Sequence, residues 1–560
     1  MPVYGASREA VPVRLLTLVA CDKHLSDNLP SYQPNRMLLE ESSTKKRKIL
    51  FDPLHLKNGS AMNQTTGAMT LEGEATPSGA KDRVKYWALL AAISAVVLVY
   101  AVTRAFVWDE GYHLIAAQQI SQGKLPYIDF CFPQTPLNAF LNGGIVKLFG
   151  QHWRPVHVVA ALFSLGAMFL TADFMLLRFP APRWRFACAL TAAVFVGLNE
   201  VVIEFGTIGQ AYGICLFFSV AAYRMALATP ARVSLLPPLV CGLLAGVAAG
   251  SSLLTAPILP VLLIWIWVYD RVGLPWRKAL AFIAGAAVAF LPVFWLFLKA
   301  PRQTFFNIAQ YHALYRRADW PGATFHDLLV FTSWIDSTQA LTLVLLAVAG
   351  VVFIKKYSAW DRRQRAEFYL ALWICVAVGA YLCTPHPTFG RYFIFLTPFV
   401  TILAMAGLYA LGSRLGYGGR PAWPAGIAGG LMTLMCVKAG INSTEATTWP
   451  EYEKVARKVA EVAPPGSKLF ADEVVYFALQ RNPPEGMEVS YTHVIAIPPD
   501  EGRLFHIVSE PELKSRIGRH EFGAVQSCSD PLMDRFGLPG PYRYRVDIDD
   551  CTIFWGERPK

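Results

Sequence analysis

Long apolar segments recur along the chain from residue 86 onward. A transmembrane helix needs about 20 mainly apolar residues to cross roughly 30 Å of hydrocarbon. Eleven segments approach that length, at 86–106, 156–177, 186–203, 207–228, 233–250, 253–269, 279–298, 338–354, 367–384, 392–411 and 423–440. We therefore predict a polytopic α-helical membrane protein with about eleven transmembrane helices. Only Ser251 and Ser252 separate the fifth and sixth segments, a spacing that also fits a broken or re-entrant pair.

The composition of the chain agrees with this pattern. Of 560 residues, 54% are hydrophobic and 16% are charged. Soluble globular domains average about 45–50% apolar and about 25% charged residues. A water-exposed surface on a chain of this length would need more polar residues. The composition therefore argues against a purely soluble enzyme, a disordered protein and a coiled coil.

The net charge of +11 is a sum of two unlike parts, because residues 1–444 carry +16 and residues 445–560 carry −5. If the apolar segments alternate across the membrane, most basic residues between them fall on one side. These are Arg178, Arg183, Arg185, Arg224, Arg232, Arg271, Arg277, Lys278, Lys355, Lys356, Arg362, Arg363, Arg365, Arg414 and Arg420. The positive-inside rule makes that side cytoplasmic. We expect a multi-pass protein of the cytoplasmic (plasma) membrane with a cytoplasmic N-terminus, and no nucleic-acid partner.

Both ends of the chain differ from the apolar middle, residues 85–444. Residues 1–84 are polar and basic without periodicity, which predicts a disordered cytoplasmic tail. Residues 445–560 hold 19 acidic and 14 basic residues, which predicts a small soluble α/β domain outside the membrane. Its predicted strands include Lys468–Phe470, Val494–Ile497 and Tyr544–Ile548. Cys528 and Cys551 in this domain could form a disulfide, which spacing alone does not decide.

The first outer loop, residues 107–155, contains the strongest candidate for chemistry. Asp109 and Glu110 follow Trp108 at the end of the first apolar segment, where a low local dielectric makes a carboxylate a stronger base. That placement suits catalysis. In the structural interpretation, both acids open an amphipathic helix that runs to about Gln122 and stops at Gly123. The two interpretations are compatible, and an apolar helix over 137–149 is predicted to follow.

Three further acidic residues are candidates to line a cavity on the same side. Asp129 is either a second site carboxylate or the cap of a turn beside the prolines of this loop. Glu200 and Glu204 share one face at the outer end of the third apolar segment. They either line a cavity with Asp109 or form a solvated helix end.

Basic residues on the outer side are candidates to bind a phosphate. Lys299, Arg302, Arg316 and Arg317 follow the seventh apolar segment. Arg391 begins the tenth segment, and its guanidinium can pair bidentately with a lipid phosphate. The alternative for Arg391 is interfacial anchoring beside Tyr392. His386, between two prolines, is a weaker candidate.

Metal and nucleotide motifs are weak in this sequence. The ten cysteines form no CxxC pair, and we find no zinc-site pattern. Asp547 and Asp549 spell a DxD motif, which we interpret as a solvated strand edge rather than a metal site. P-loop, GxSxG, HExxH and Rossmann patterns are missing. No cofactor is predicted, and a divalent metal is left open.

Several of these segments together resemble a known family. In order they are WDEGYH, a helix ending in GKLPYIDF, FPQTPL and KLFG in the first loop, and GRYFIFLTPF later in the chain. This arrangement resembles GT-C-type glycosyltransferases, in particular the protein mannosyltransferase, aminoarabinose transferase and lipopolysaccharide-core galacturonosyltransferase relatives. The similarity covers about residues 85–440. It departs from the family pattern at Gln134 and Thr135, so the donor and the acceptor are not implied through that segment.

The resemblance implies an activity and a role for several residues. Such proteins move a hexosyl or pentosyl group from a polyprenyl-phosphate carrier to a lipid, glycan or protein acceptor on the outer membrane face. It implies that Asp109 is the general base, that Glu110 orients or tunes it, and that reaction proceeds by inverting single displacement. We expect Arg391, with His386 and Lys299, to bind the donor phosphate. A lipid or glycan flippase, a transporter and a glycan polymerase or ligase are the alternatives.

Overall fold

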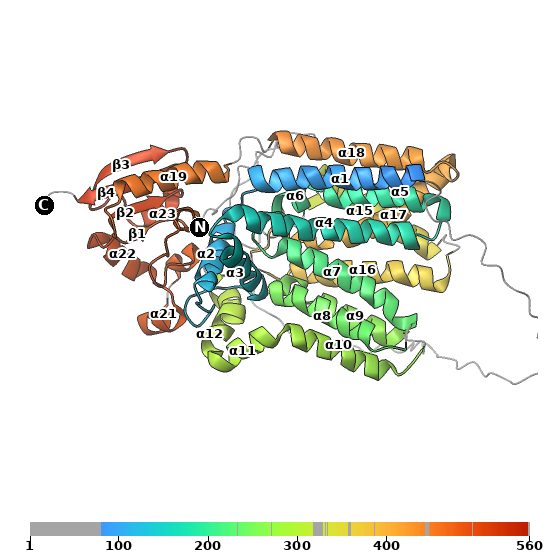
Figure 1. The fold of residues 1–560 in the computed structure, drawn as a ribbon, viewed down its shortest axis with the longest axis horizontal. Helices are drawn as coiled ribbons and strands as arrows, with labels where there is room; N and C mark the ends of the chain where they lie inside the picture. The colour runs from blue at the N-terminus through green and yellow to red at the C-terminus, as the bar shows by residue number, and fades with distance from the viewer. Residues whose placement is uncertain are drawn as a thin grey trace, which may run out of the picture. The chain divides into compact units, whose positions relative to one another are not determined.

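The computed structural model describes residues 80–557 except 232, 270–271, 317–326, 328, 331, 333, 336, 357–359, 386, 443–446 and 496. The predicted tail up to residue 79 lies outside the described residues, while residues 80–84 already belong to the first helix. Figure 1 shows a bundle of long helices from the middle of the chain and a smaller domain with a β-sheet at its C-terminal end.

All eleven apolar segments form helices. In chain order they are α1 (Ala80–Thr103), α4 (Trp153–Arg178), α5 (Arg185–Gly197) with α6 (Glu200–Phe205), α7 (Tyr212–Ala228), α8 (Leu236–Ser251), α9 (Ile258–Tyr269), α10 (Pro275–Ala289) with α11 (Leu291–Lys299), α15 (Thr338–Lys356), α16 (Arg362–Leu382), η5 (Gly390–Leu396) with α17 (Thr397–Gly412), and α18 (Ala422–Asn442). Short helical turns η1 (Pro182–Trp184), η2 (Thr229–Ala231), η3 (Leu253–Thr255) and η6 (Ser413–Tyr417) join them.

These helices differ in their length. Within the described residues, six are long and apolar enough to cross a membrane, namely α1, α4, α15, α16, α18 and the run Gly390–Tyr417. The pair α10 and α11 would be a seventh span, but it bends by 55°. Pro292 lies in the first turn of α11 and removes a backbone donor there, which explains the bend. The shorter apolar helices include α7, α8 and α9.

Small residues bring neighbouring helices of the bundle close together. Gly350 on α15 faces α17, and Gly407 on α17 faces α15. A Cβ atom on Gly407 would overlap the carbonyl oxygen of Leu346. Because lipid tails are as apolar as leucine, helices in membranes associate through such close backbone packing.

The first outer loop folds as predicted. Helix α2 (Glu110–Ser121) ends just before Gly123, whose φ of +93° suits glycine, and α3 (Leu137–Phe149) follows. Between them, Tyr127, Phe130 and Phe132 are buried. A second outer segment contains α12 (Pro301–Phe305) and the π-helix η4 (Phe306–Tyr315).

The C-terminal domain contains a mixed four-stranded sheet. Its elements are α19 (Trp449–Val462), β1 (Leu469–Phe470), α20 (Glu473–Ala478), η8 (Ser490–Val494), α21 (Pro499–Phe505), α22 (Glu510–Gly518), β2 (Ala524–Ser527), α23 (Asp530–Arg535), β3 (Tyr542–Ile548) and β4 (Cys551–Glu557). The strand order is β1-β2-β4-β3, with β1 and β2 parallel. A disulfide joins Cys528 to Cys551.

One predicted strand of this domain is wrong. Two of the three predicted strands exist, as β1 and β3, but residues 490–494 form the 3-10 helix η8 and residues 495 and 497 belong to no strand. The backbone N–H of Ile495, inside the predicted strand, donates to the carbonyl oxygen of Thr492 over 3.2 Å, which satisfies it without a strand neighbour. The DxD segment lies at the end of β3, an edge strand, as predicted.

The C-terminal domain shares an apolar core with α2, α3 and the start of α4, which we call the outer helices. The ring of Trp449 on α19 stacks on that of Trp153 at the start of α4, with centroids 5.5 Å apart. Phe106 stacks on Tyr452 at 4.7 Å. Leu114 and Ile115 of α2 belong to the same buried cluster. Such a continuous core fixes the domain against the helices that carry the first outer loop.

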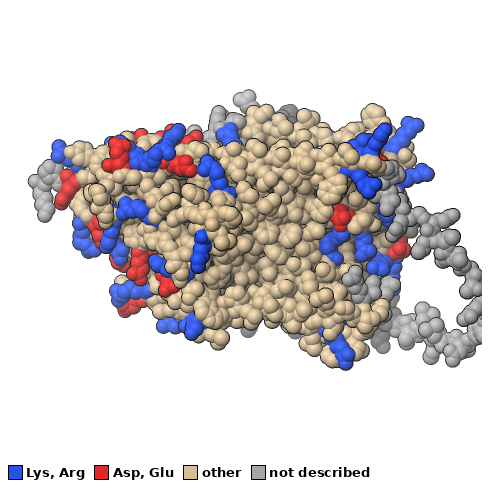
Figure 2. Space-filling view, viewed as in Figure 1, with Lys and Arg blue, Asp and Glu red and all other residues tan. Residues whose placement is uncertain are grey.

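Charged side chains are distributed unevenly over the face seen in Figure 2. Lys and Arg gather at the end of the bundle away from the C-terminal domain, and both signs of charge cover that domain. A broad band between them carries few charges. This is the distribution that the apolar segments and the loop charges predicted.

Candidate active site

A cavity of about 510 Å³ lies where the outer helices meet the C-terminal domain. We call it the outer cavity. Its lining includes the start of α2, the segment between α2 and α3, the segment after α6, the π-helix η4, the start of η5, and η8. Polar lining residues include Asp109, Tyr112, His113, Gln134, Gln210, Tyr311, His312, Arg316, Arg391, Tyr392 and Tyr491. Segments far apart in the sequence therefore form one polar cavity.

Among the described residues, Asp109 is the acid that faces this cavity. It is the N-cap residue of α2, and its side chain is 14% exposed. Arg391 Nη2, from η5, pairs with Asp109 Oδ2. The phenolic hydroxyl of Tyr491, from η8, donates to Asp109 Oδ1. The structure thus brings together Asp109 and Arg391, two of the residues that the sequence singled out.

A second guanidinium lies close to that of Arg391. Arg316 Nη2 donates to Tyr392 Oη at 3.0 Å and to the carbonyl oxygen of Pro387 at 3.3 Å. The ring of Phe389 lies beside both cations, with its centroid 4.5 Å from Arg391 Cζ and 5.4 Å from Arg316 Cζ. The Asp109 carboxylate balances one of these two positive charges, and the remaining charge makes this wall attractive to an anion such as a phosphate.

Two buried histidines complete the polar lining. Burial lowers the pKa of His113 to about 3 and that of His312 to about 4. His312 Nε2 lies 2.8 Å from the carbonyl oxygen of Pro133, and this contact fits a neutral ring that donates from that nitrogen. Neutral imidazoles supply hydrogen bonds at neutral pH without adding charge to the cavity.

Some buried polar atoms of the lining have no hydrogen-bond partner within the described residues. They are Arg391 Nε, His113 Nδ1, Gln210 Nε2 and Thr135 Oγ1. Buried polar groups in folded proteins are nearly always paired. Unpaired polar atoms around one cavity indicate a place where a polar ligand or water completes the pairing.

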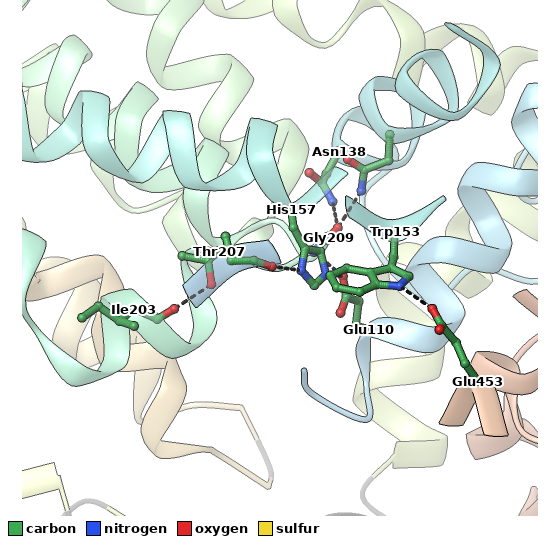
Figure 3. Close-up of polar contacts among 10 residues, drawn as sticks. Glu110, Asn138, Trp153, His157, Ile203, Thr207, Gly209 and Glu453 are labelled. Atoms are coloured by element: carbon green, nitrogen blue, oxygen red, sulfur yellow. Dashed lines mark hydrogen bonds and ion pairs between the residues drawn. The ribbon is translucent and has the colours of Figure 1, made fainter. Parts of the chain in front are cut away.

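Glu110, next to Asp109, does not line the outer cavity. Its side chain is fully buried, and Oε1 lies 2.6 Å from His157 Nε2 and accepts from Gly209 N over 2.6 Å (Figure 3). The carbonyl oxygen of Gly209 accepts from Asn138 and Asn142. Glu110 therefore anchors the segment that leads into the cavity residues Gln210 and Ala211.

The other acidic candidates lie outside the lining. Asp129 Oδ2 accepts from the backbone N–H of Leu125 over 2.7 Å, which matches the turn-cap interpretation. Glu200 and Glu204 lie on α6, and neither contributes to the outer cavity. The structure therefore does not gather these three carboxylates around Asp109.

The basic candidates divide in the same way. Lys299 ends α11 and Arg302 lies in α12, both outside the cavity lining. His386 and Arg317 lie outside the described residues. Arg316 lines the cavity together with Arg391. The sequence offered Arg316 as a basic candidate but did not place it among the residues expected to bind the donor phosphate.

Sequence reasoning missed Tyr491, His113 and His312. Tyr491 is 382 residues from its partner Asp109, and no motif surrounds it. The pairs Tyr112–His113 and Tyr311–His312 repeat an aromatic-histidine dipeptide, which was the available signal. No group of three or more His, Cys, Asp and Glu able to hold a metal occurs in the part of the chain that the structure describes.

Comparison with known proteins identifies the fold. No protein-family model and no curated protein sequence matches the chain. Two crystal structures of ArnT from Cupriavidus metallidurans, one bound to undecaprenyl phosphate and one in the apo state, match with a TM-score of 0.60 and 14% identity. Each match covers 84% of this chain and 98% of that one. An oligosaccharyltransferase from Archaeoglobus fulgidus, in complex with zinc and sulfate, matches with a TM-score of 0.42.

The chain therefore has a GT-C-type fold with a small C-terminal domain, as the sequence predicted. The structural neighbour ArnT is an aminoarabinose transferase of the GT-C type, and its alignment extends over nearly its whole length.

Proposed function

We propose that this protein is an integral membrane glycosyltransferase that uses a polyprenyl-phosphate-linked sugar. The observation that carries the proposal is the pairing of Asp109 with Arg391 at a cavity that also contains Arg316. An acid able to take a proton thus lies beside cations able to hold a phosphate, and both lie at the outer ends of apolar helices. The GT-C-type fold supports this assignment, because the neighbour ArnT binds undecaprenyl phosphate.

The donor phosphate is assigned to the wall formed by Arg391 and Arg316. Arg391 uses Nη2 for Asp109, and its buried Nε has no partner within the described residues, so it has a donor left for a phosphate oxygen. Arg316 replaces Lys299 in this role, because Lys299 lies outside the cavity lining. The polyprenyl tail would remain in lipid while the phosphate reaches the polar cavity.

In the proposed reaction, Asp109 removes the proton from an acceptor hydroxyl as the oxygen of that hydroxyl attacks the anomeric carbon of the donor sugar. The bond from that carbon to the phosphate oxygen breaks, and the polyprenyl phosphate leaves with its negative charge against Arg391 and Arg316. A single displacement inverts the anomeric configuration. General-base catalysis contributes about 10²–10⁴-fold, and stabilisation of the leaving charge is of similar size.

The charge distribution supports an orientation for this reaction. Basic residues gather at the end of the bundle opposite the C-terminal domain (Figure 2). By the positive-inside rule that end is cytoplasmic, so the outer cavity and the C-terminal domain lie on the extracytoplasmic side of the plasma membrane. The acceptor is then a lipid, glycan or protein hydroxyl on that side.

The proposal is tested with Asp109→Asn, which keeps the size and the hydrogen-bond acceptor of the side chain but removes its basicity. The full-length protein in lipid nanodiscs is incubated with undecaprenyl-phosphate sugars. Membranes of the source organism from which this protein has been removed are added to supply the acceptor. Released undecaprenyl phosphate is measured, which does not require the sugar or acceptor to be known. We expect a rate at least about 100-fold lower than that of the unchanged protein.

Asp500→Asn is the matched control, because Asp500 is an exposed residue of the C-terminal domain. It should transfer at the normal rate. Transfer by Asp109→Asn within threefold of the unchanged protein would refute the role of Asp109. Movement of lipid-linked sugar between leaflets without release of undecaprenyl phosphate would instead establish a flippase.

A further inference from the structure

Tyr491 belongs to the C-terminal domain, yet its hydroxyl donates to Asp109 at the outer cavity. We propose that the C-terminal domain is part of the active site, and that Tyr491 is a positioning residue that fixes the Asp109 carboxylate for the attacking hydroxyl. This inference rests on the proposed function and deepens it. The sequence of the domain has no recognisable motif at Tyr491 and did not suggest this role.

The two oxygens of the Asp109 carboxylate are held from different parts of the molecule. Arg391, at the start of the span that contains α17, pairs with Oδ2, and Tyr491 donates to Oδ1. Each carboxylate oxygen has two lone pairs. One donor on each oxygen fixes the rotation of the group and leaves a lone pair on Oδ1 for an acceptor hydroxyl. Without Tyr491, the carboxylate could rotate about its Cβ–Cγ bond while it stays paired with Arg391.

Tyr491 acts as a donor in this contact. Burial and the nearby Asp109 carboxylate raise the pKa of the Tyr491 phenol well above its usual value of 10. The phenol therefore keeps its proton throughout the range in which enzymes work, and Asp109 receives a hydrogen bond rather than a competing negative charge. The ring of Tyr491 also makes an edge contact with that of Tyr112, with centroids 5.8 Å apart.

The position of Tyr491 is fixed by its neighbours in the domain. The preceding residue, Ser490, donates its backbone N–H to the buried Glu473 Oε1 at 2.6 Å. Glu473 begins α20, which packs directly against α2. A Cβ atom on Gly111 would lie 2.9 Å from Glu473 Cβ and 3.2 Å from Val474 Cγ1. The absence of a side chain at Gly111, two residues after Asp109, lets α20 approach closely enough to place Tyr491.

Tyr491→Phe tests the inference because it removes only the hydroxyl. Release of undecaprenyl phosphate by the full-length protein gives kcat and KM, and binding of undecaprenyl phosphate itself is measured separately. We expect kcat to fall about tenfold or more, as for a lost hydrogen bond to a charged group. KM for the lipid-linked sugar and the affinity for undecaprenyl phosphate should stay within twofold, because Tyr491 acts on Asp109 and not on the phosphate.

Tyr542→Phe is the matched control. It removes a hydroxyl from the same domain, where Tyr542 donates to the carbonyl oxygen of Phe522 at 3.1 Å, and Tyr542 does not line the outer cavity. Its kcat should equal that of the unchanged protein. Gly111→Ala provides a second variant, in which the added methyl group pushes α20 away from α2. Its kcat should fall in the same direction although no group that touches Asp109 has changed.

The outcomes distinguish this inference from the proposed function. If Asp109→Asn is inactive but Tyr491→Phe keeps a normal kcat, the role of Tyr491 is refuted and the proposed function stands. A loss of affinity for undecaprenyl phosphate that equals the loss of kcat would also overturn the positioning role. If Asp109→Asn and Tyr491→Phe both transfer normally, both proposals fail.

Discussion

Glu110 and His157 form a buried pair whose energetic coupling can be measured. Both side chains are fully buried, and Glu110 Oε1 lies 2.6 Å from His157 Nε2. The other ring nitrogen, Nδ1, lies 2.8 Å from the carbonyl oxygen of Ala101. Both ring nitrogens of His157 therefore make their polar contacts inside the protein. Removal of either side chain leaves the other with one buried polar contact fewer.

The size of the effect follows from these contacts. Breaking a buried pair by removing one partner destabilises a protein by about 3–5 kcal/mol. Glu110→Ala also deprives the buried Gly209 N–H of its acceptor, which adds about 1–3 kcal/mol. We expect His157→Ala to destabilise by about 3–5 kcal/mol and Glu110→Ala by about 4–8 kcal/mol. The double variant should be no less stable than Glu110→Ala alone, because the pair can be broken only once.

The assay is denaturant unfolding of the four proteins in the same mixed micelles, analysed as a double-mutant cycle. The expected coupling energy is about 3 kcal/mol. Additive effects within about 0.5 kcal/mol would show that the two side chains do not depend on each other, and would refute the reasoning.

Two further predictions concern the C-terminal domain and the helix bundle. Burial raises the pKa of Asp472 to about 7, so the folded domain favours the protonated acid. The contribution of Asp472 to the stability of the domain should therefore be greatest near pH 4 and fall as the pH rises toward 7. In thermal unfolding between pH 4 and 8, Asp472→Asn should reduce that fall. Gly407→Ala should destabilise the bundle by about 1–3 kcal/mol in the same unfolding assay, because its Cβ would overlap the Leu346 carbonyl oxygen. Gly379→Ala is the control and should be neutral or stabilising, because its Cβ would lie 3.7 Å from Leu396 Cδ1.

Features that depend on short stretches of chain could be predicted from the sequence. The length needed to cross a bilayer made the eleven apolar segments visible, and all of them are helical. Helix α2 could be bounded because Gly123 adopts a positive φ that ends a helix readily. Asp109 and Arg391 could be named because each lies at the end of an apolar segment, and the family resemblance implied the role of Asp109.

Features that depend on side-chain direction or on distant contacts could not be predicted. Consecutive residues on a helix point about 100° apart, so Asp109 and Glu110 face different surroundings. The sequence pattern does not say which of the two faces the cavity. Tyr491 lies just before the predicted strand Val494–Ile497, in a short helix whose first backbone N–H donates to Glu473 of another element. The partnership of Arg316 with Arg391 likewise requires the tertiary fold.

The stacking of Trp153 on Trp449 has a consequence for how this protein can be divided. A shortened chain that ends near residue 444 would leave Trp153, Leu114 and Ile115 without their covering and would lose the phenol that reaches Asp109. The helical part is then not a self-sufficient unit to which an accessory module has been attached. Exchange of the C-terminal domain with that of a relative should succeed only if the outer surfaces of α2 and α4 are exchanged with it.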